Sequence, residues 1–190
     1  TLFPYTTLFR SRCEVKILAW CLMTNHVHFI AVPQTETSFA RGFGEAHKRY
    51  TRMKNFSDNV RGYLFQGRFG SCVLDQRHLL AAVRYVENNP VVAGMAKHAW
   101  QYKWSSAAYH VGLIKKDVLV DSRNLYGLVN NWRNYLDEQT EEIDDVQYVK
   151  RATKTGRPAG DSNFVKKIEQ LTGRLLRREK PGPKNKKKKG

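Results

Sequence analysis

Two histidines lie one residue apart, His26 and His28, in the stretch "TNHVHFIAVP" (residues 24–33). The β-branched and apolar residues around them are typical of a strand, in which side chains two positions apart point to the same face. We therefore expect both imidazoles on one face, with Val27 and Phe29 on the other. Two neighbouring imidazoles provide half of a metal site, and the remaining ligands must come from another element.

Tyr85 and Asn89 could supply the other half. They lie one helical turn apart in "QRHLLAAVRYVENN" (residues 76–89) and share a face away from the apolar stripe. The stripe is formed by Leu79, Leu80, Val83 and Val86. A tyrosine hydroxyl can attack a phosphodiester, but its ordinary pKa of about 10 means that it needs activation. A divalent metal on two imidazoles and an amide oxygen, Mg²⁺ or Mn²⁺, can stabilise the charge that develops on the phosphate.

Other interpretations of these residues remain open. A His-x-His pair alone is more often exposed or structural than a metal site, and the lack of a third alternating histidine argues against a His-triad nucleotide hydrolase. Tyr50 is a competing nucleophile, because it lies among basic residues. His78 is expected at the surface. Arg68 either contacts phosphate or solvates the end of a strand.

The elements that must position these residues follow from patterning and chain breaks. Residues 14–23 and 26–32 are expected to form an antiparallel pair of strands, and residues 68–75 another strand. Helices are expected over 38–55, with Ser38 as its cap, and over 76–89, where Pro90 stops it. Beyond residue 121 we expect a helix with an acidic end at 125–142, a Gly/Pro-rich linker at 154–163 and a short basic helix at 164–179.

The net charge of +16 and the isoelectric point near 9.9 indicate a polyanionic partner, either nucleic acid or an anionic membrane. Residues 150–190 hold 15 Lys and Arg against 3 Asp and Glu, a net charge of +12. No stretch is apolar enough to span a membrane and no signal peptide is visible, so we expect a cytoplasmic protein. DNA contacts are expected from five side chains and a lysine run: Lys48, Arg49, Arg52, Lys54, Arg68, and Lys186, Lys187, Lys188 and Lys189.

Four motifs occur in a familiar order and spacing: "CLMTNHVHFIAVP", "LFQGRF", "RYVENNPVVAGM" and "WSSAAYHVG". Over about residues 15–183 the chain resembles the REP-associated tyrosine transposases, relatives of the single-tyrosine HUH transposases of small insertion sequences. The resemblance implies that His26-Val27-His28 is the HUH motif, Tyr85 the nucleophile and Asn89 the third metal ligand. It also implies a basic C-terminal extension.

The expected fold class is α+β, with a ferredoxin-like antiparallel sheet, helices on one side and the basic extension. Residues 1–11, "TLFPYTTLFRS", match the translation of a common sequencing adapter, and we expect them to be an artefact. The expected divisions are a catalytic domain at 12–121, lacking the family's first strand and helix, an acidic helical segment at 122–150, and a partly disordered DNA-binding tail at 151–190.

The resemblance implies a metal-dependent endonuclease and strand transferase acting on single-stranded, hairpin-forming DNA through a 5′-phosphotyrosine. The alternative is a DNA-binding protein that keeps the fold and the basic surface without catalysis. A replication initiator or relaxase would use the same chemistry but usually carries larger accessory domains. The sequence does not decide between a monomer and a homodimer, nor does it give the hairpin recognised.

Overall fold

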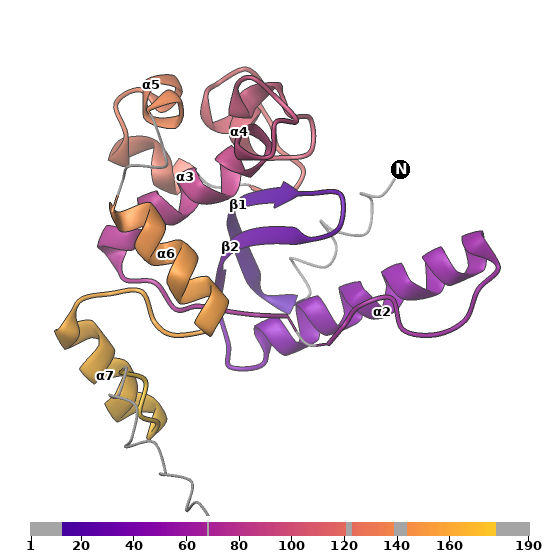
Figure 1. The fold of residues 1–190 in the computed structure, drawn as a ribbon, viewed down its shortest axis with the longest axis horizontal. Helices are drawn as coiled ribbons and strands as arrows, with labels where there is room; N and C mark the ends of the chain where they lie inside the picture. Colours follow the sequence, from indigo (N-terminus) through magenta and orange to yellow (C-terminus); the bar gives the residue numbers. More distant parts are fainter. Residues whose placement is uncertain (1–12, 68, 121–122, 139–143, 178–190) are drawn as a thin grey trace, which may run out of the picture.

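The computed structural model describes residues 13–67, 69–120, 123–138 and 144–177, and Figure 1 shows how their elements are arranged. The elements in chain order are strands β1 (Val15–Leu22) and β2 (Val27–Pro33), helices α2 (Ser38–Asp58) and α3 (Gln76–Val92), 3-10 helix η1 (Ala99–Gln101), helix α4 (Ala107–His110), 3-10 helix η2 (Arg123–Leu128), and helices α5 (Trp132–Asp137), α6 (Asp144–Thr155) and α7 (Ser162–Thr172).

β1 and β2 form the antiparallel pair expected from the sequence. Trp20 pairs with Phe29 and Cys21 with His28, and the register shifts between Ile17 and Ala19. The α+β class is therefore confirmed. The two strands are the only regular ones among the described residues, so the larger ferredoxin-like sheet stays a prediction.

The edge of β1 that faces away from β2 is covered by later parts of the chain. Cys21 forms an antiparallel bridge with Ser105, and Ile17 forms a parallel bridge with Val120. Leu22 N donates to Trp104 O at 2.8 Å, which satisfies the last amide of the strand. Segments some 85 to 100 residues away thus supply the backbone partners that this edge needs.

The helices contact both faces of the strand pair, whereas we expected them on one side. Cys21 and Ile30 belong to the core cluster that includes Val83 of α3. Phe29, which points to the opposite face, contacts Phe43 of α2 with their ring centroids 5.5 Å apart. The alternation of side chains along a strand is what divides the two cores.

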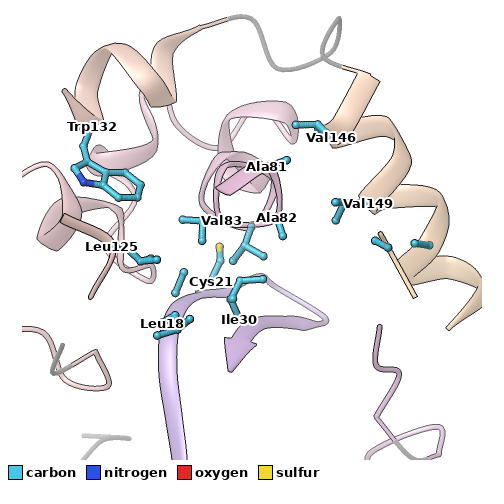
Figure 2. Close-up of a cluster of buried hydrophobic side chains, with 14 residues drawn as sticks. Leu18, Cys21, Ile30, Ala81, Ala82, Val83, Leu125, Trp132, Val146 and Val149 are labelled. Atoms are coloured by element: carbon cyan, nitrogen blue, oxygen red, sulfur yellow. The ribbon is translucent and has the colours of Figure 1, made fainter. Parts of the chain in front are cut away.

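Helix α3 lies at the centre of the larger core. Figure 2 shows Ala82 and Val83 directly above Leu18, Cys21 and Ile30 of the strands. Trp132 and Leu125 close one flank of α3, and Val146 and Val149 of α6 close the other. With nine of its 17 residues buried, α3 is fixed from several directions.

Two expectations about helix ends were wrong. Pro90 does not stop α3 but is buried inside its last turn, where packing outweighs the loss of the amide that would have bonded to the Val86 carbonyl. Ser38 does not cap α2, whose N-cap residue is Thr37. The Ser38 hydroxyl instead accepts a hydrogen bond from Thr35 N at 2.9 Å and is buried.

The strand expected over residues 68–75 is also wrong for the described part of that segment. Only Leu74 forms a bridge, a parallel one with Ala159. Ala159 N donates to Val73 O at 2.7 Å, and Asp75 N donates to Ala159 O at 2.9 Å. The backbone hydrogen bonds of this extended segment are therefore made with Ala159, which lies in the expected linker.

The C-terminal part is more compact than its composition suggests. The helix expected over 125–142 is divided into η2 and α5, and α6 crosses the expected boundary at residue 150 to pack on α3. Helix α7 begins at Ser162, inside the expected linker, ends at Thr172, before the expected end of the basic helix at residue 179, and has no buried residue. No helix in the described part of the chain is both long and apolar enough to cross a bilayer.

Candidate active site and DNA-binding surface

Three aromatic rings from two elements meet on the α3 side of the strand pair. The ring centroids of His26 and His28 are 4.8 Å apart, and those of His28 and Tyr85 are 5.5 Å apart. His28 lies in β2, opposite Cys21, and His26 directly precedes the strand. The structure therefore brings together the two imidazoles and the tyrosine that the sequence singled out.

One hydrogen bond of His26 and one unsatisfied nitrogen of His28 show which ring atoms could bind a ligand. His26 Nδ1 lies 2.7 Å from Asn25 Oδ1, and because this oxygen only accepts, Nδ1 carries the proton. His28 Nε2 is buried and has no hydrogen-bond partner among the described residues. Burial, and next the neighbouring His26, lower the pKa of His28 to about 4, so this imidazole is neutral at pH 7.

Tyr85 is half-buried, and burial raises the pKa of its hydroxyl above the ordinary value, while a hydrogen bond with Asn89 lowers it. Asn89 Nδ2 also donates to Tyr85 O at 2.7 Å. With its amide nitrogen engaged, Asn89 has its oxygen left for another partner. Tyr85 is thus protonated at neutral pH and needs help to act as a nucleophile.

The residues present fit a divalent metal. The described residues contain no group of three His, Cys, Asp or Glu side chains that could hold one, so any such site needs a ligand of another type. His26, His28 and the Asn89 oxygen would be two nitrogens and one oxygen, and the orphaned His28 Nε2 is the atom that such an ion would satisfy.

A buried polar cluster two residues beyond Tyr85 was missed by sequence reasoning. Glu87 accepts hydrogen bonds from the Ser106 hydroxyl and from His110 Nδ1, the latter at 2.6 Å, and both partners are buried. Ser106 Oγ also accepts from Trp20 N at 2.9 Å, which ties α3 to β1. The sequence signal that could have indicated this cluster is Glu87 itself, a glutamate directly after the core position Val86 of an amphipathic helix.

Asn25, which hydrogen-bonds to His26, was also missed, although an amide directly before a predicted metal-binding motif is a readable signal. His78, expected at the surface, is buried instead. Its Nδ1 lies 2.6 Å from Asp75 Oδ1, the same oxygen that accepts from His78 N at the start of α3. His78 therefore belongs to the N-terminal cap of α3 and makes no described contact with Tyr85.

The basic residues expected to bind DNA lie on α2, which projects away from the rest of the molecule (Figure 1). Lys48 and Arg49 both pair with Glu45, Arg49 at 2.7 Å. Lys54 pairs with Asp58 at 2.8 Å. Arg68 and the run of lysines at 186–189 lie outside the described residues, so their role stays a prediction.

Residues 5–89 match the model of the family described as "Transposase IS200 like". This part of the chain is therefore similar to the IS200-like transposases. The matched region contains both histidines, α2, and α3 as far as Asn89, so it takes in every residue of the candidate site, and the match supports transposase-type action on DNA. The match begins at residue 5, inside the segment 1–11 that we expected to be an artefact, and it does not support that expectation. No curated protein and no solved structure matches the chain.

Proposed function

We propose that this chain is a REP-associated tyrosine transposase: a metal-dependent nuclease and strand transferase for single-stranded DNA that folds into hairpins. The observation that carries the proposal is the contact series His26–His28–Tyr85, with ring centroids 4.8 Å and 5.5 Å apart, next to Asn89. The proposal is supported by the contact of the proposed nucleophile with the two proposed metal ligands, which come from separate elements within one matched region.

In the proposed reaction the Tyr85 oxygen attacks phosphorus and the bond from phosphorus to the 3′ oxygen breaks. The tyrosine loses its proton, the leaving 3′ oxygen gains one, and a 5′-phosphotyrosine results. Because the bond energy is kept in the covalent link, a second 3′ hydroxyl can reverse the step at a new position without a nucleotide cofactor.

The residues of this chain have distinct tasks. His26 and His28 would hold the divalent ion together with Asn89, and that ion supplies positive charge for the phosphate. Asn25 fixes the tautomer of His26 by accepting its Nδ1 proton. The packing of α3 against the strands holds Tyr85 toward His28, which limits the reorientation needed before attack.

The test is a covalent adduct between the chain and a hairpin oligonucleotide with Mg²⁺ or Mn²⁺, detected on a denaturing gel. Tyr85→Phe should abolish the adduct and keep DNA affinity and folding, since only a hydroxyl is removed. Tyr50→Phe is the matched control on α2 and should retain it. An adduct that persists in Tyr85→Phe and disappears in Tyr50→Phe would overturn the assignment. A parent chain that binds hairpins but never forms an adduct would favour the non-catalytic alternative.

A further inference from the structure

The far end of α2 carries an open cavity that the candidate active site does not use. It has a volume of about 470 Å³, and its lining includes Arg52, Met53, Phe56, Val60 and Arg61. This volume is within the range of small-ligand sites. The lining combines apolar surface with two guanidinium groups, on an arm that Figure 1 shows well away from α3 and β2.

The cavity is preformed by the way α2 ends. Asn59 adopts a left-handed conformation, with a φ of 51°. Val60 N donates to Asn55 O at 2.9 Å, and Asn59 N donates to Phe56 O at 3.4 Å, which together make a Schellman motif. The Asn55 side chain then donates to Gly62 O at 2.9 Å and holds the returning loop.

The loop also folds back along α2. Phe65 stacks on His47, with ring centroids 4.0 Å apart and an interplanar angle of 16°. This contact uses Phe65 for packing but leaves the ring of Phe56 uncovered, with 91% of its surface exposed. Met53 and Val60 of the lining are exposed beside Phe56, and a contiguous exposed apolar surface of this kind marks an interaction site.

The charges identify the partner. In the part of the chain that the structure describes, Glu45 and Asp58 are the acids that pair with Lys48, Arg49 and Lys54 along α2. Arg52 and Arg61, which line the cavity, have no ion-pair partner among the described residues. Two unpaired guanidinium groups beside an exposed ring suit a ligand with a phosphate and a flat aromatic face.

We infer that this cavity binds an unpaired nucleotide of single-stranded DNA, with its base on Phe56 and the adjoining phosphates on Arg52 and Arg61. The inference rests on the proposed function, which makes single-stranded DNA the substrate. It adds a second contact region outside the catalytic centre, where DNA flanking the cleaved bond would be held. A paired base cannot stack there, because both of its faces are covered within a duplex.

The experiment measures binding by fluorescence anisotropy with a labelled single-stranded oligonucleotide and with its duplex. Phe56→Ala should weaken single-strand binding about tenfold and leave duplex binding nearly unchanged. Leu128→Ala, which removes an exposed apolar side chain from η2 in the acidic segment, is the control and should change neither. Arg52→Gln with Arg61→Gln should weaken binding and flatten its salt dependence more than the charge-matched Lys115→Gln with Lys116→Gln.

An abasic residue moved along the oligonucleotide identifies the contact. At one position the abasic DNA should bind the parent chain and Phe56→Ala equally well, because base and ring no longer meet in either complex. Phe56→Trp should restore affinity and show added fluorescence quenching when single-stranded DNA binds. Phe56→Ala binding that equals the parent's, or an equal loss at every abasic position, would overturn the site.

Two other results separate this inference from its alternatives. If Phe56→Ala changed the sedimentation coefficient and left DNA affinity unchanged, the surface would be covered by a second copy of the chain, and the inference would be wrong. If the parent chain formed no Tyr85 adduct but retained the Phe56-dependent and base-dependent affinity, the proposed function would fail and the nucleotide site would stand.

Discussion

Helices α2 and α3 contact opposite faces of the same two strands, yet they are built in opposite ways. In α3 nine residues are buried, including Arg84, Glu87 and Asn88, whereas in α2 only Ser38 is buried. The difference matches what the proposed function asks of each helix. A nucleophile must be held in one position relative to the imidazoles, whereas side chains that bind a polyanion must stay exposed and adaptable.

The comparison predicts that substitutions around α3 act on chemistry or folding and that substitutions on α2 act on affinity. The largest effect is expected from His28→Ala. It removes the imidazole beside Tyr85 and should lower adduct formation at least about 100-fold, the loss typical of one group that stabilises developing charge. DNA affinity should change little, since phosphate contacts come from elsewhere.

Single-turnover adduct assays on denaturing gels measure this effect. His98→Ala is the control, because His98 stacks on Trp100 and lies 2.9 Å from Asp137, far along the chain from the strands. If His28→Ala formed the adduct at the parent rate with Mg²⁺ and with Mn²⁺, the two imidazoles would not belong to the active site. The assignment of chemistry to α3 and of DNA affinity to α2 would then be wrong.

The next effect concerns stability. Glu87→Ala leaves the buried His110 and Ser106 without their shared acceptor, and losing the partner of a buried hydrogen bond costs about 1–3 kcal/mol. Urea unfolding followed by circular dichroism should show this loss. Glu36→Ala, in the exposed turn before α2, should stay within about 0.5 kcal/mol of the parent. Equal stability of both variants would mean that the cluster does not fix α3.

Two deletions from the C-terminus test which part of the basic region stabilises the fold and which part supplies DNA affinity. Because Val149 and Ala152 of α6 pack in the core, a deletion at residue 150 should destabilise the fold. Deletion of residues 174–190 removes nine Lys and Arg against one Glu and spares the described helices. We expect weaker binding to all DNA and a flatter dependence of log K on log salt. If the deletion changed which hairpin is preferred and left the salt slope unchanged, the segment would recognise particular DNA sequences rather than supply general affinity.

The sequence was a good guide where the pattern was local. Alternation gave β1, β2 and the shared face of His26 and His28, and helical spacing gave the common face of Tyr85 and Asn89. These features depend on periods of two and 3.6 residues, which a short window contains.

The sequence was a poor guide where the partner was distant. Residues 73–75 are extended because of Ala159, about 85 positions later, and no pattern in either segment indicates the other. The burial of Glu87 likewise depends on Ser106 and His110, which only folding brings to α3. Pro90 was misjudged because packing outweighed a propensity, a common result at the end of a buried helix.

A smaller effect is expected from pH. The pKa of His28 is lowered to about 4 in the folded chain by burial, and secondly by His26, while it is near 6.5 in the unfolded chain. Between these values the unfolded state binds a proton at His28 that the folded state does not. The stability that results is fully present above pH 6.5 and is lost as the pH falls toward 4.

Urea titrations at several pH values without added metal measure this dependence. In His28→Ala the free energy of unfolding should rise less steeply between pH 4 and 6.5 than in the parent, whatever the variant's stability at neutral pH. Other acidic groups, such as Asp75 with its lowered pKa, contribute to both proteins, so only the difference in slope is informative. Identical slopes would place His28 in water rather than against Tyr85.

The smallest effect should come from the ion pairs on α2. Lys54 donates to Asp58 at about 3 Å, and this carboxylate competes with DNA phosphates for the ammonium group. Asp58→Asn should leave the stability nearly unchanged, as expected for an exposed pair one turn apart. It should nevertheless raise DNA affinity a few-fold at low salt, with the gain disappearing as salt increases. Glu36→Gln removes the same charge from a residue that does not pair with Lys54. It therefore separates the effect of releasing Lys54 from the effect of raising the net charge of the chain. If Asp58→Asn instead weakened DNA binding while Glu36→Gln did not, Asp58 would be positioning Lys54 for DNA rather than competing for it, and the exposed charges of α2 would be as closely arranged as the buried ones of α3.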